Sequence, residues 1–509
     1  MFFEPRVGTI AEALTGRRWV PDDVARAVDR RVRRFQHHGL ARGERVFVHF
    51  GNRLEFFAEL LAVWRLGGCV VPIDGRLTPF ELENLARAAA PRLSVVDEGT
   101  APEVVRALAA TGVVVIDTEE TVTDGPPSPA GRSRLDDDAL ILFTSGSTGS
   151  PKGVVHTHRS LLARWTSLRQ QLGLEVFART LCLLPTHFGH GLICNCLFPW
   201  LGGQDLIITP PFRPDLIMRL GTLLDEHRIT FLSSVPSVWR VALKMARPPR
   251  AATLRRVHCG SAPLSASLWE DIRAWCGTRE VLNAYGITET GSWVAGTTGG
   301  GFTPEDGLVG EPWGAAVWIR RTADTTAPLD ADLDCAVGEA GYVWLRTPAL
   351  MKGYFDRDDL TAQVVADGWF MTGDIGLQDE RGRLYLRGRE RDEINKGGLK
   401  IYPADVDAVV ERFDRATDVC AFALDDPVYG QNVGIAVVLA QRDDATIRDL
   451  HHWMKRHLAD HKMPVRWYLL DEIPRTSRGK VNRELVARRC AEQQPVLPRR
   501  GAVADRYSA

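Results

Sequence analysis

TSGSTGSPKG, residues 144–153, is the most informative stretch of this 509-residue sequence. An apolar run, ALILF at 139–143, precedes it and predicts a strand, and VVHTHRSLLARW follows it, with Thr157 or His158 as the candidate start of a helix. A glycine-rich loop between a strand and a helix gathers backbone N–H groups around a phosphate. The stretch therefore predicts a phosphate-binding loop, although a Gly/Ser loop taken alone is as often a solvated linker.

The residue types in this loop suit a polyphosphate. Gly146, Gly149 and Gly153 allow close approach of the backbone, and Lys152 supplies a compact positive charge. The loop is not a Walker A loop, because Pro151 stands where that pattern needs its second glycine. Hydroxyl donors come from four residues, Thr144, Ser145, Ser147 and Thr148.

Composition narrows the class of protein. Lys and Arg number 63 against 64 Asp and Glu, so the net charge of −1 gives no reason to expect nucleic acid or an anionic membrane as a partner. No apolar run is long enough for a membrane span, and Glu4 and Arg6 interrupt the segment that a signal peptide would need. We therefore expect a cytoplasmic protein whose nine scattered cysteines are reduced thiols.

The pattern between residues 40 and 300 predicts an α/β fold. Short β-rich runs stand at 46–50, 69–73, 93–97 and 113–117, and longer amphipathic stretches alternate with them. RLEFFAELLAVWRLGG, at 53–68, carries apolar residues at helical spacing and ends in a glycine pair. Such βαβ units imply largely parallel sheets that are covered on both faces.

Five motifs together resemble those of the adenylate-forming superfamily, which groups acyl- and aryl-CoA ligases, nonribosomal peptide adenylation domains and beetle luciferases. TSGSTGSPKG is similar to the signature loop of that family, and the other four follow in the family's order and at its approximate spacing. These are YGITE (285–289), TGD (372–374), GRERDEINKGGLKIYP (388–403) and PRTSRGKVNR (474–483). The chain looks closest to the acyl-CoA synthetases.

The resemblance implies a division into domains. A large N-terminal domain of βα-layered sheets, residues 1–390, would bind ATP and the acid, and a smaller, mobile α+β domain, residues 391–490, would carry the catalytic lysine. We expect the polar segment 491–509 to be a disordered tail.

It also implies a reaction in two steps. A carboxylate attacks the α-phosphate of MgATP to give an acyl-adenylate and pyrophosphate, and a thiol, that of coenzyme A, then displaces AMP. The anhydride is needed because a free carboxylate would have to expel oxide. Bringing two anions together requires cations and dipoles. The cofactors that the resemblance implies are ATP, Mg²⁺ and coenzyme A, or the phosphopantetheine of a carrier protein in its place.

Residues of the motifs receive roles in ATP binding from the same resemblance. Thr288 would bond the α-phosphate, Glu289 would bind Mg²⁺ through the oxygen ligands that this cation prefers, and Lys152 would assist. The alternative interpretation of YGITE is that Tyr285 is an ordinary core residue and Glu289 an ordinary surface residue, neither with a role in binding ATP. The remaining ATP-binding candidates are the loop residues Thr144, Ser145, Gly146, Ser147, Thr148 and Gly149, the adenine-stacking Tyr285, and the ribose-binding Asp374 with its companion Arg389.

Two stretches resemble the lining of the acyl pocket. HCGSAPLS, at 258–265, presents Gly260, Ser261 and Ala262 flat against adenine and the acid, unless these small residues reflect packing only. LLPTHFGHGLICN, at 183–195, places Phe188 at the position of an aromatic gate. The other pocket candidates are His187, His190, Trp239, Gly286, Ile287 and Trp293, with Val294 beside them; its aromatic residues are equally compatible with plain core.

The acid is predicted to be aryl or apolar. Relatives that activate α-amino acids use an Asp to pair the substrate ammonium, and no Asp occurs in residues 183–195. His187 and His190 lack further ligands at the spacing of a metal site, so a metal there is not expected.

The C-terminal motifs supply the remaining assignments. Lys480 would reach the reacting carboxylate, although an exposed lysine is otherwise a solvated charge, and Gly397 and Gly398 would let pantetheine approach. Arg391 stands at the hinge, where Asp or Lys is more familiar. An acyl or peptidyl carrier protein remains the alternative acceptor to coenzyme A. A binding-only relative would have lost Lys480, Glu289 or Asp374, and all three are present.

Overall fold

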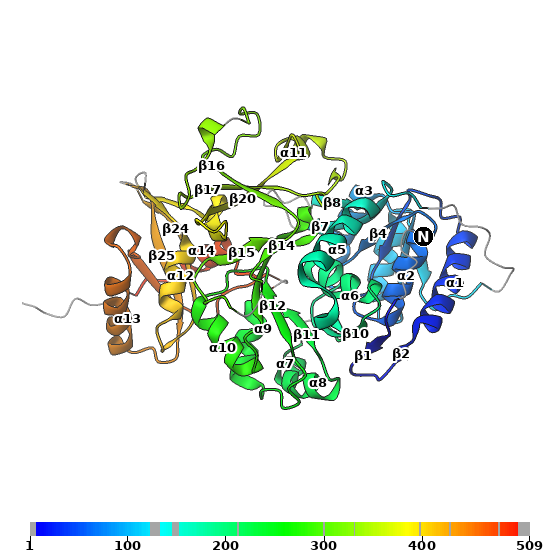
Figure 1. The fold of residues 1–509 in the computed structure, drawn as a ribbon, viewed down its shortest axis with the longest axis horizontal. Coiled ribbons are helices and arrows are strands. Elements are labelled where there is room, and N and C mark those ends of the chain that lie inside the picture. Colours follow the sequence, from blue (N-terminus) through cyan, green and yellow to red (C-terminus); the bar gives the residue numbers. More distant parts are fainter. Residues whose placement is uncertain are drawn as a thin grey trace, which may run out of the picture.

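The protein is described by a computed structural model that covers most of the chain. The described residues are 7–122, 133–144, 152–210, 213–298, 301–329, 331–396, 399–426, 429–476 and 479–496. Of the predicted loop residues, 145–151 lie outside this description, as do Gly397, Gly398 and residues 497–509. Figure 1 shows the N-terminal half of the chain at the right of the view and the C-terminal end at the left.

The first sheet has the strand order β18-β8-β7-β4-β3-β5-β6. Strands β3 to β7 run parallel where they pair, and β8 and β18 add antiparallel partners at one edge. This confirms the four strands expected before residue 120. Their bounds are β3 Arg45–Val48, β4 Cys69–Pro72, β5 Leu93–Val96, β6 Val114–Asp117, β7 Asp138–Thr144, β8 Lys152–Thr157 and β18 Gly353–Tyr354.

Alternate residues of a strand point to opposite sides of the sheet. Both sides of this sheet are apolar, and helices cover both faces. Val46 and Val48 belong to the core under α1 (Pro21–His37) and α2 (Leu54–Arg65), whereas Phe47 belongs to the core under α3 (Pro79–Ala89) and α4 (Pro102–Ala110).

The second sheet has the order β16-β17-β20-β21-β15-β14-β13-β12-β11-β9-β10-β1-β2, with β19 beside β20. Pairing is parallel from β1 through β13 and antiparallel from β14 to β16. The bounds are β1 Ile10–Glu12, β2 Arg18–Trp19, β9 Arg179–Cys182, β10 Asp205–Ile208, β11 Phe231–Ser234, β12 Arg256–Gly260, β13 Val281–Ile287, β14 Ser292–Gly296, β15 Leu308–Pro312, β16 Ala316–Arg320, β17 Gly341–Arg346, β19 Val365–Ala366, β20 Trp369–Gln378 and β21 Leu384–Arg389.

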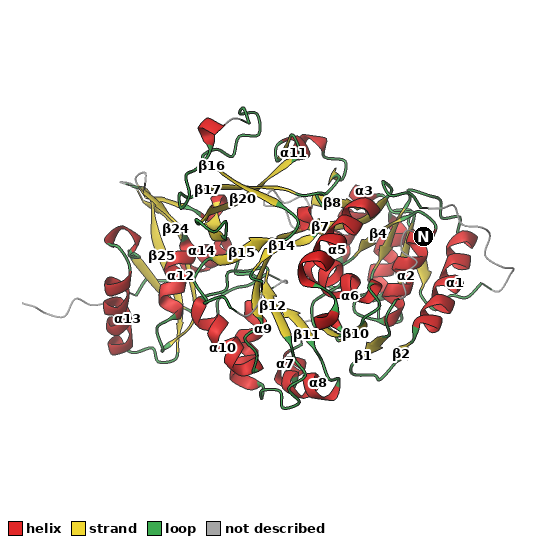
Figure 2. Cartoon of the chain, viewed as in Figure 1, coloured by secondary structure: helices red, strands yellow, loops and turns green. Residues whose placement is uncertain are grey.

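Helical segments connect and cover these strands, as the red ribbons of Figure 2 show. They are α5 His158–Leu172, α6 Phe198–Leu201, α7 Pro214–Met218, α8 Leu220–Glu226, α9 Pro236–Met245, α10 Ala266–Cys276 and α11 Asp358–Ala362. Shorter turns are η1 Glu175–Phe177, the π-helical η2 His190–Leu197, η3 Thr288–Thr290, η4 Ala331–Leu333 and η5 Glu390–Asp392.

The C-terminal part forms a separate α+β unit with its own core. Its sheet has the order β23-β22-β25-β24, with β26 beside β25, and Ile394, Val406 and Leu450 lie in one buried cluster. At the expected tail, the amide of Val496 donates to the carbonyl of Trp467 (2.7 Å). The elements are β22 Ile394–Lys396, β23 Leu399–Ile401, α12 Pro403–Glu411, β24 Ala416–Asp426, β25 Gly430–Leu439, α13 Asp444–His457, η6 Asp460–Lys462, β26 Arg466–Leu469 and α14 Arg483–Ala491.

The expected order of strand, loop and helix around residues 144–153 is wrong in one respect. The loop joins β7 to an antiparallel strand, β8, with Thr144 opposite Lys152. The run KGVVHT favours a strand because it contains the β-branched residues Val154, Val155 and Thr157 and its four central residues are buried. Helix α5 begins at His158, as expected, and the Thr157 hydroxyl accepts from the Ser160 amide (3.2 Å) as an N-cap. The helix N-terminus is therefore separated from the loop by a whole strand.

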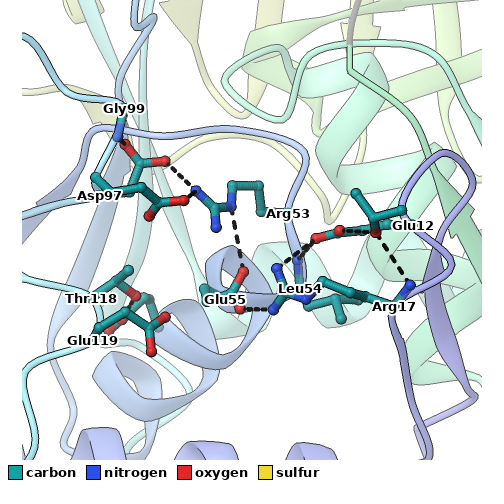
Figure 3. Close-up of polar contacts among 12 residues, drawn as sticks. Glu12, Arg17, Arg53, Leu54, Glu55, Asp97, Gly99, Thr118 and Glu119 are labelled. Carbon is teal, nitrogen blue, oxygen red and sulfur yellow. Dashed lines mark hydrogen bonds and ion pairs between the residues drawn. The ribbon is translucent and has the colours of Figure 1, made fainter.

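Charged side chains tie the two large sheets together (Figure 3). Glu12 of β1 accepts from the Leu54 amide at the start of α2 (3.3 Å) and pairs with Arg17 (3.4 Å). Glu55 forms ion pairs with Arg17 and with Arg53, the latter at 3.5 Å. Arg53 in turn reaches Asp97 after β5 (2.8 Å), so the network joins the second sheet to the first.

Other features of the fold bear on the expectations from composition. In the part of the chain that the structure describes, every helix is too short or too polar to cross a membrane. All nine cysteines are free thiols, and eight of them are buried.

We predict that Glu55→Ala destabilises the protein through this network. The Glu55 side chain is 3% exposed and would leave two arginines without a shared partner. The free energy of unfolding should fall by about 2 kcal/mol, below the roughly 3–5 kcal/mol of fully buried pairs, since both arginines remain partly solvated. Urea denaturation measures the change. Asp215→Ala, which removes the exposed pair with Arg213, is the matched control, and an equal loss in both variants would contradict the prediction.

Candidate active site

The residues on either side of the candidate phosphate-binding loop lie in two strands of the first sheet. Thr144 ends β7 and Lys152 begins β8. The ammonium of Lys152 lies 5.5 Å from the ring centroid of Tyr354 in the neighbouring strand β18. Lys152 therefore points toward the β18 edge of the sheet.

Tyr285, Asp374 and Arg389 come together in the second sheet. Asp374 and Arg389 face each other across the β20–β21 pair, and the guanidinium Nε lies 2.8 Å from the carboxylate Oδ1. The Tyr285 hydroxyl, at the end of β13, donates to the other oxygen of Asp374. The negative charge of Asp374 raises the pKa of Arg389 against the effect of its burial. Burial, together with that charge, raises the pKa of Tyr285.

Glu289 lies in the short turn η3 that follows β13. Its carboxylate Oε1 accepts a hydrogen bond from the Tyr354 hydroxyl (2.8 Å). Burial and the nearby carboxylate of Glu289 raise the pKa of Tyr354, so it stays a phenol that donates. Tyr354 was not among the sequence candidates, and it joins the first sheet to the turn that carries Thr288 and Glu289.

The backbone at Gly260 and Ser261 has a shape that few residues allow. A Cβ on Gly260 would stand 2.1 Å from the carbonyl oxygen of Ala284, so only glycine fits between β12 and β13. Ser261 has φ +65°, in the left-handed region that costs a non-glycine residue energy. Strain of this kind, held by the surrounding structure, is common at functional sites.

His190 connects Ser261 to the interior. Its Nδ1 lies 2.8 Å from the Ser261 hydroxyl and its Nε2 lies 2.6 Å from the Ser233 hydroxyl in β11. Burial, and then the positive charge of Lys480, lower the pKa of His190 to about 3, so the ring is neutral at physiological pH. Lys480 belongs to the C-terminal unit, whereas His190 begins the π-helical segment η2 of the N-terminal part.

The loop that carries Lys480 packs directly on the N-terminal part. Gly479 has φ +76°, and a Cβ there would stand 2.5 Å from the Ser237 hydroxyl at the start of α9. Within the loop, the Thr476 amide donates to the Lys480 carbonyl (2.7 Å). Further along α9, Arg240 forms an ion pair with Glu411 of α12. Burial raises the pKa of Glu411, while Arg240 and a hydrogen bond with Ser265 oppose that shift.

Aromatic side chains gather around His190. The ring of Trp293 lies 5.5 Å from His190 and 4.5 Å from His258, and Phe188 lies 5.9 Å from His190, all between ring centroids. Trp239 packs against Trp275 at 5.4 Å.

The remaining pocket candidates occupy β13 and β14. Gly286 is required by a close approach, since a Cβ would stand 2.0 Å from the carbonyl oxygen of Ser292, and Ile287 packs beside Val154 and Tyr354. Val294 lies in the same buried cluster as Tyr285, whereas its neighbour Trp293 lies in the main core. Successive strand residues point to opposite faces, so Trp293 and Val294 lie on opposite faces of β14.

His187 has a carboxylate neighbour that the sequence segment did not reveal. Asp74, which follows β4 in the first sheet, lies 3.3 Å from the His187 ring nitrogen. Arg76 donates to both oxygens of Asp74 (2.9 and 2.8 Å). Burial alone would raise the pKa of Asp74, but the hydrogen bonds of Arg76 and the charge of His187 lower it. The negative charge of Asp74 is therefore already compensated within the protein.

Two predicted features have little described geometry. Arg391 lies within η5, where its backbone is described. Among the described residues, no cluster of three or more His, Cys, Asp or Glu side chains could hold a metal ion by itself. A single carboxylate such as Glu289 still suits a magnesium ion that arrives with the phosphates of a nucleotide, because Mg²⁺ usually takes only one or two protein carboxylates.

Comparison with protein families decides the classification. The profile of the AMP-binding enzyme family matches residues 10–355, and that of the AMP-binding enzyme C-terminal domain matches residues 405–480. The chain belongs to the AMP-binding enzyme family. This confirms the predicted superfamily and the predicted α/β fold with a large N-terminal and a smaller C-terminal domain.

Similar proteins agree with this classification. The long-chain-fatty-acid–CoA ligase FadD13 of Mycobacterium tuberculosis is 29% identical over 467 residues, which cover 87% of each protein. Feruloyl-CoA synthase of an Amycolatopsis species is 30% identical over 474 residues, 92% of this chain and 93% of that protein. The crystal structure of ATP-bound MatB from Rhodopseudomonas palustris matches with a TM-score of 0.83 at 25% identity, over 96% of each chain. The protein is an AMP-forming acid–thiol ligase of the acyl-CoA synthetase type.

Proposed function

We propose that this enzyme converts an aryl or apolar carboxylic acid to its acyl-adenylate with MgATP and then transfers the acyl group to the thiol of coenzyme A. One observation carries the proposal. The loop that carries Lys480 in the C-terminal unit packs on α9 of the N-terminal domain, where a Cβ on Gly479 would stand 2.5 Å from the Ser237 hydroxyl, and the positive charge of Lys480 helps to lower the pKa of His190. A cation at this point can neutralise the two anions that must meet in the first step.

The ATP-binding roles rest on the groups gathered in the second sheet. Asp374 accepts from Tyr285 and pairs with Arg389, so its carboxylate is fixed in orientation, as binding of the ribose hydroxyls requires. The ring of Tyr285 stacks on adenine in this proposal, beside Gly260, Ser261 and Ala262. The loop before Lys152 holds the β- and γ-phosphates.

Glu289 is the proposed magnesium ligand. The Tyr354 hydroxyl donates to one of its oxygens (2.8 Å), and the other oxygen, which has no hydrogen-bond partner among the described residues, would bind the cation. When bound, Mg²⁺ would neutralise phosphate charge and make pyrophosphate a better leaving group. The hydroxyl of Thr288, one residue earlier, bonds the α-phosphate.

The chemistry of the two steps balances without a further reactant. In the first, an oxygen of the carboxylate forms a bond to the α-phosphorus while the bond to the β-phosphate oxygen breaks, and pyrophosphate leaves. In the second, the thiol sulfur attacks the acyl carbon, the proton of the thiol is released and AMP leaves. Lys480 assists the first step by its charge.

The proposed acceptor is coenzyme A, in line with the names of the two relatives. A carrier protein bearing phosphopantetheine remains the alternative, since both acceptors present the same thiol. Pantetheine would approach along Gly397 and Gly398. The C-terminal domain, taken to begin at residue 391, would turn about Arg391 so that Lys480 leaves before the thiol enters.

The choice of an aryl or apolar acid rests on the aromatic wall and on Asp74. Trp293 and Phe188 flank His190. Asp74 is paired with Arg76 and His187, so it offers no spare negative charge for the ammonium of an α-amino acid. The two relatives are named for a long-chain fatty acid and for ferulate, which supports an apolar or aryl acid without choosing between them.

We predict that Lys480→Ala separates the two half-reactions. Pyrophosphate formation should fall by about 10²-fold or more, because charge stabilisation in the transition state is lost. Thioester formation from supplied acyl-adenylate should stay within about threefold, because the lysine is absent from the second pose. Arg488→Ala removes an exposed charge on α14 and is the control. An equal fall in both half-reactions of folded protein would contradict the assignment of Lys480.

A panel of acids tests the proposed substrate class. Pyrophosphate release should be measured with aryl, medium-chain and long-chain acids and with the standard amino acids, each with and without coenzyme A. We expect turnover with at least one aryl or apolar acid, dependent on Mg²⁺, and none above background with free α-amino acids. Robust exchange of pyrophosphate into ATP with an amino acid alone would refute the predicted class.

A further inference from the structure

The turn that carries Thr288 and Glu289 is held by its backbone carbonyls. Three successive carbonyl oxygens, those of Thr288, Glu289 and Thr290, each accept a hydrogen bond from a different element. The donors are His156 of β8, the amide of Met351 in the segment before β18, and Arg164 of α5. Such a convergence on three consecutive peptides fixes the orientation of the turn as a whole.

His156 contributes the first of these bonds. Its Nε2 lies 2.8 Å from the Thr288 oxygen and its Nδ1 lies 3.2 Å from the Ser160 hydroxyl. A carbonyl only accepts, so Nε2 must carry the proton and Nδ1 is the unprotonated nitrogen of the neutral ring. Complete burial lowers the pKa of His156 to about 4, which keeps this single tautomer at neutral pH.

Arg164 contributes the strongest contact. Its Nε and Nη2 lie 3.2 and 2.9 Å from the Thr290 oxygen, and its Nη1 lies 2.8 Å from the Trp313 oxygen. The side chain is fully buried, and within the described residues it forms no ion pair. Burial lowers the pKa of Arg164 to about 10, so it keeps its charge at neutral pH. A buried cation that faces only carbonyl and hydroxyl oxygens is costly to a fold, and here two of its donors bind the turn that carries Thr288 and Glu289.

The donors from β8 and α5 share one continuous segment with the phosphate-binding loop candidate. Lys152 and His156 lie four residues apart on one face of β8, and Ser160 and Arg164 lie four residues apart on one face of α5. Strand β8 belongs to the first sheet, whereas η3 follows β13 of the second sheet. The segment 152–164 therefore spans the junction between the two sheets.

We propose that Arg164 and His156 are positioning residues for adenylate formation, which hold Thr288 and Glu289 at a fixed place relative to the phosphates bound by the loop before Lys152. This inference rests on the proposed function. It assigns a purpose to a buried charge that has no partner of opposite sign among the described residues.

The geometry of the turn explains why such support is needed. The chain leaves η3 through Gly291 at φ +69° and Ser292 at φ +74°, and the second of these is a strained conformation for a serine. A turn of this kind relaxes when its carbonyls lose their donors. A displacement of about 1 Å at a reacting centre can cost on the order of 10²-fold in rate.

The test compares both half-reactions in Arg164→Met, which keeps the length of the side chain and removes its charge and donors. Pyrophosphate formation should slow by about 10- to 100-fold, and the Mg²⁺ concentration for half-maximal rate should rise at least about threefold. Thioester formation from supplied acyl-adenylate should fall clearly less than pyrophosphate formation, because that step keeps the contact of Thr288 with the α-phosphate but uses neither Mg²⁺ nor the β- and γ-phosphates. The rate of pyrophosphate formation by Arg164→Lys should lie between the rates of Arg164→Met and the wild type. An ammonium keeps the charge but cannot donate to all the oxygens that the guanidinium reaches.

Arg320→Met is the matched control. Arg320 is also fully buried, donates to a carbonyl, that of Pro328 (2.6 Å), and forms no ion pair within the described residues. It lies in β16 and packs over Trp318 and Trp344. This variant should lose stability while its Mg²⁺ dependence and its ratio of half-reaction rates stay those of the wild type.

The outcomes separate this inference from the proposed function. An active wild type whose Arg164→Met variant is folded and shows an unchanged Mg²⁺ dependence, or an equal loss in both half-reactions, overturns the positioning role. A wild type that forms no acyl-adenylate with any acid overturns the proposed function instead. If Arg164→Met does not fold, His156→Phe decides by the same two readouts, and an unchanged Mg²⁺ dependence there again overturns the inference.

Discussion

The contact between Gly479 and Ser237 is the constraint on which the proposed catalytic arrangement depends. The chain reaches this point in a left-handed conformation that favours glycine, and a Cβ there would stand 2.5 Å from the hydroxyl of Ser237 at the start of α9. Lys480 follows directly. Its positive charge adds to the effect of burial in lowering the pKa of His190, which lies in the π-helical segment η2. Arg240 and Glu411 join the same two parts of the molecule one turn further along α9. Helix α9 of the N-terminal domain thus contacts the C-terminal domain both by close packing and by an ion pair.

The rest of the candidate site is assembled at a junction of sheets rather than within one of them. The second sheet supplies Tyr285, Asp374 and Arg389 as one hydrogen-bonded group. The first sheet supplies Lys152 and Tyr354, and the Tyr354 hydroxyl crosses to Glu289. The nucleotide and the acid are both anionic. Such a site therefore has to combine cations from separate elements with carboxylates that hydrogen bonds already hold in place. Placing it between two rigid sheets limits the movement of each group.

Much of the fold and the site could be predicted from the sequence, because the evidence is local. Alternating apolar runs predict the parallel strands β3 to β6, and the motifs predict the superfamily. The prediction failed where the structure of a segment depends on which strand pairs with it. The start of a helix at Thr157 or His158 was predicted correctly, but the pairing of KGVVHT with β7 as an antiparallel strand was not, although burial of its valines favours that strand.

The contacts that sequence reasoning missed all join segments distant in the chain. Tyr354 meets Glu289, Asp74 meets His187, and Arg164 meets Thr290. None of these pairs follows from spacing, since each depends on how the two sheets are placed. A weaker signal was present: the four-residue spacing of Lys152, His156, Ser160 and Arg164 puts these polar residues on one face of a strand and then of a helix.

The most direct test of the account is to lock the Gly479–Ser237 contact with a disulfide. A Cβ on Gly479 lies 3.6 Å from that of Ser237, within the roughly 3.5–4.5 Å that a disulfide spans. In the oxidised Ser237→Cys/Gly479→Cys variant, a single turnover of pyrophosphate formation should proceed at nearly the rate of the reduced form. Thioester formation should fall at least about tenfold and return on reduction, with each single variant unaffected by oxidant. Undiminished thioester formation by the locked protein would show that the C-terminal domain need not leave this pose, and would contradict the account.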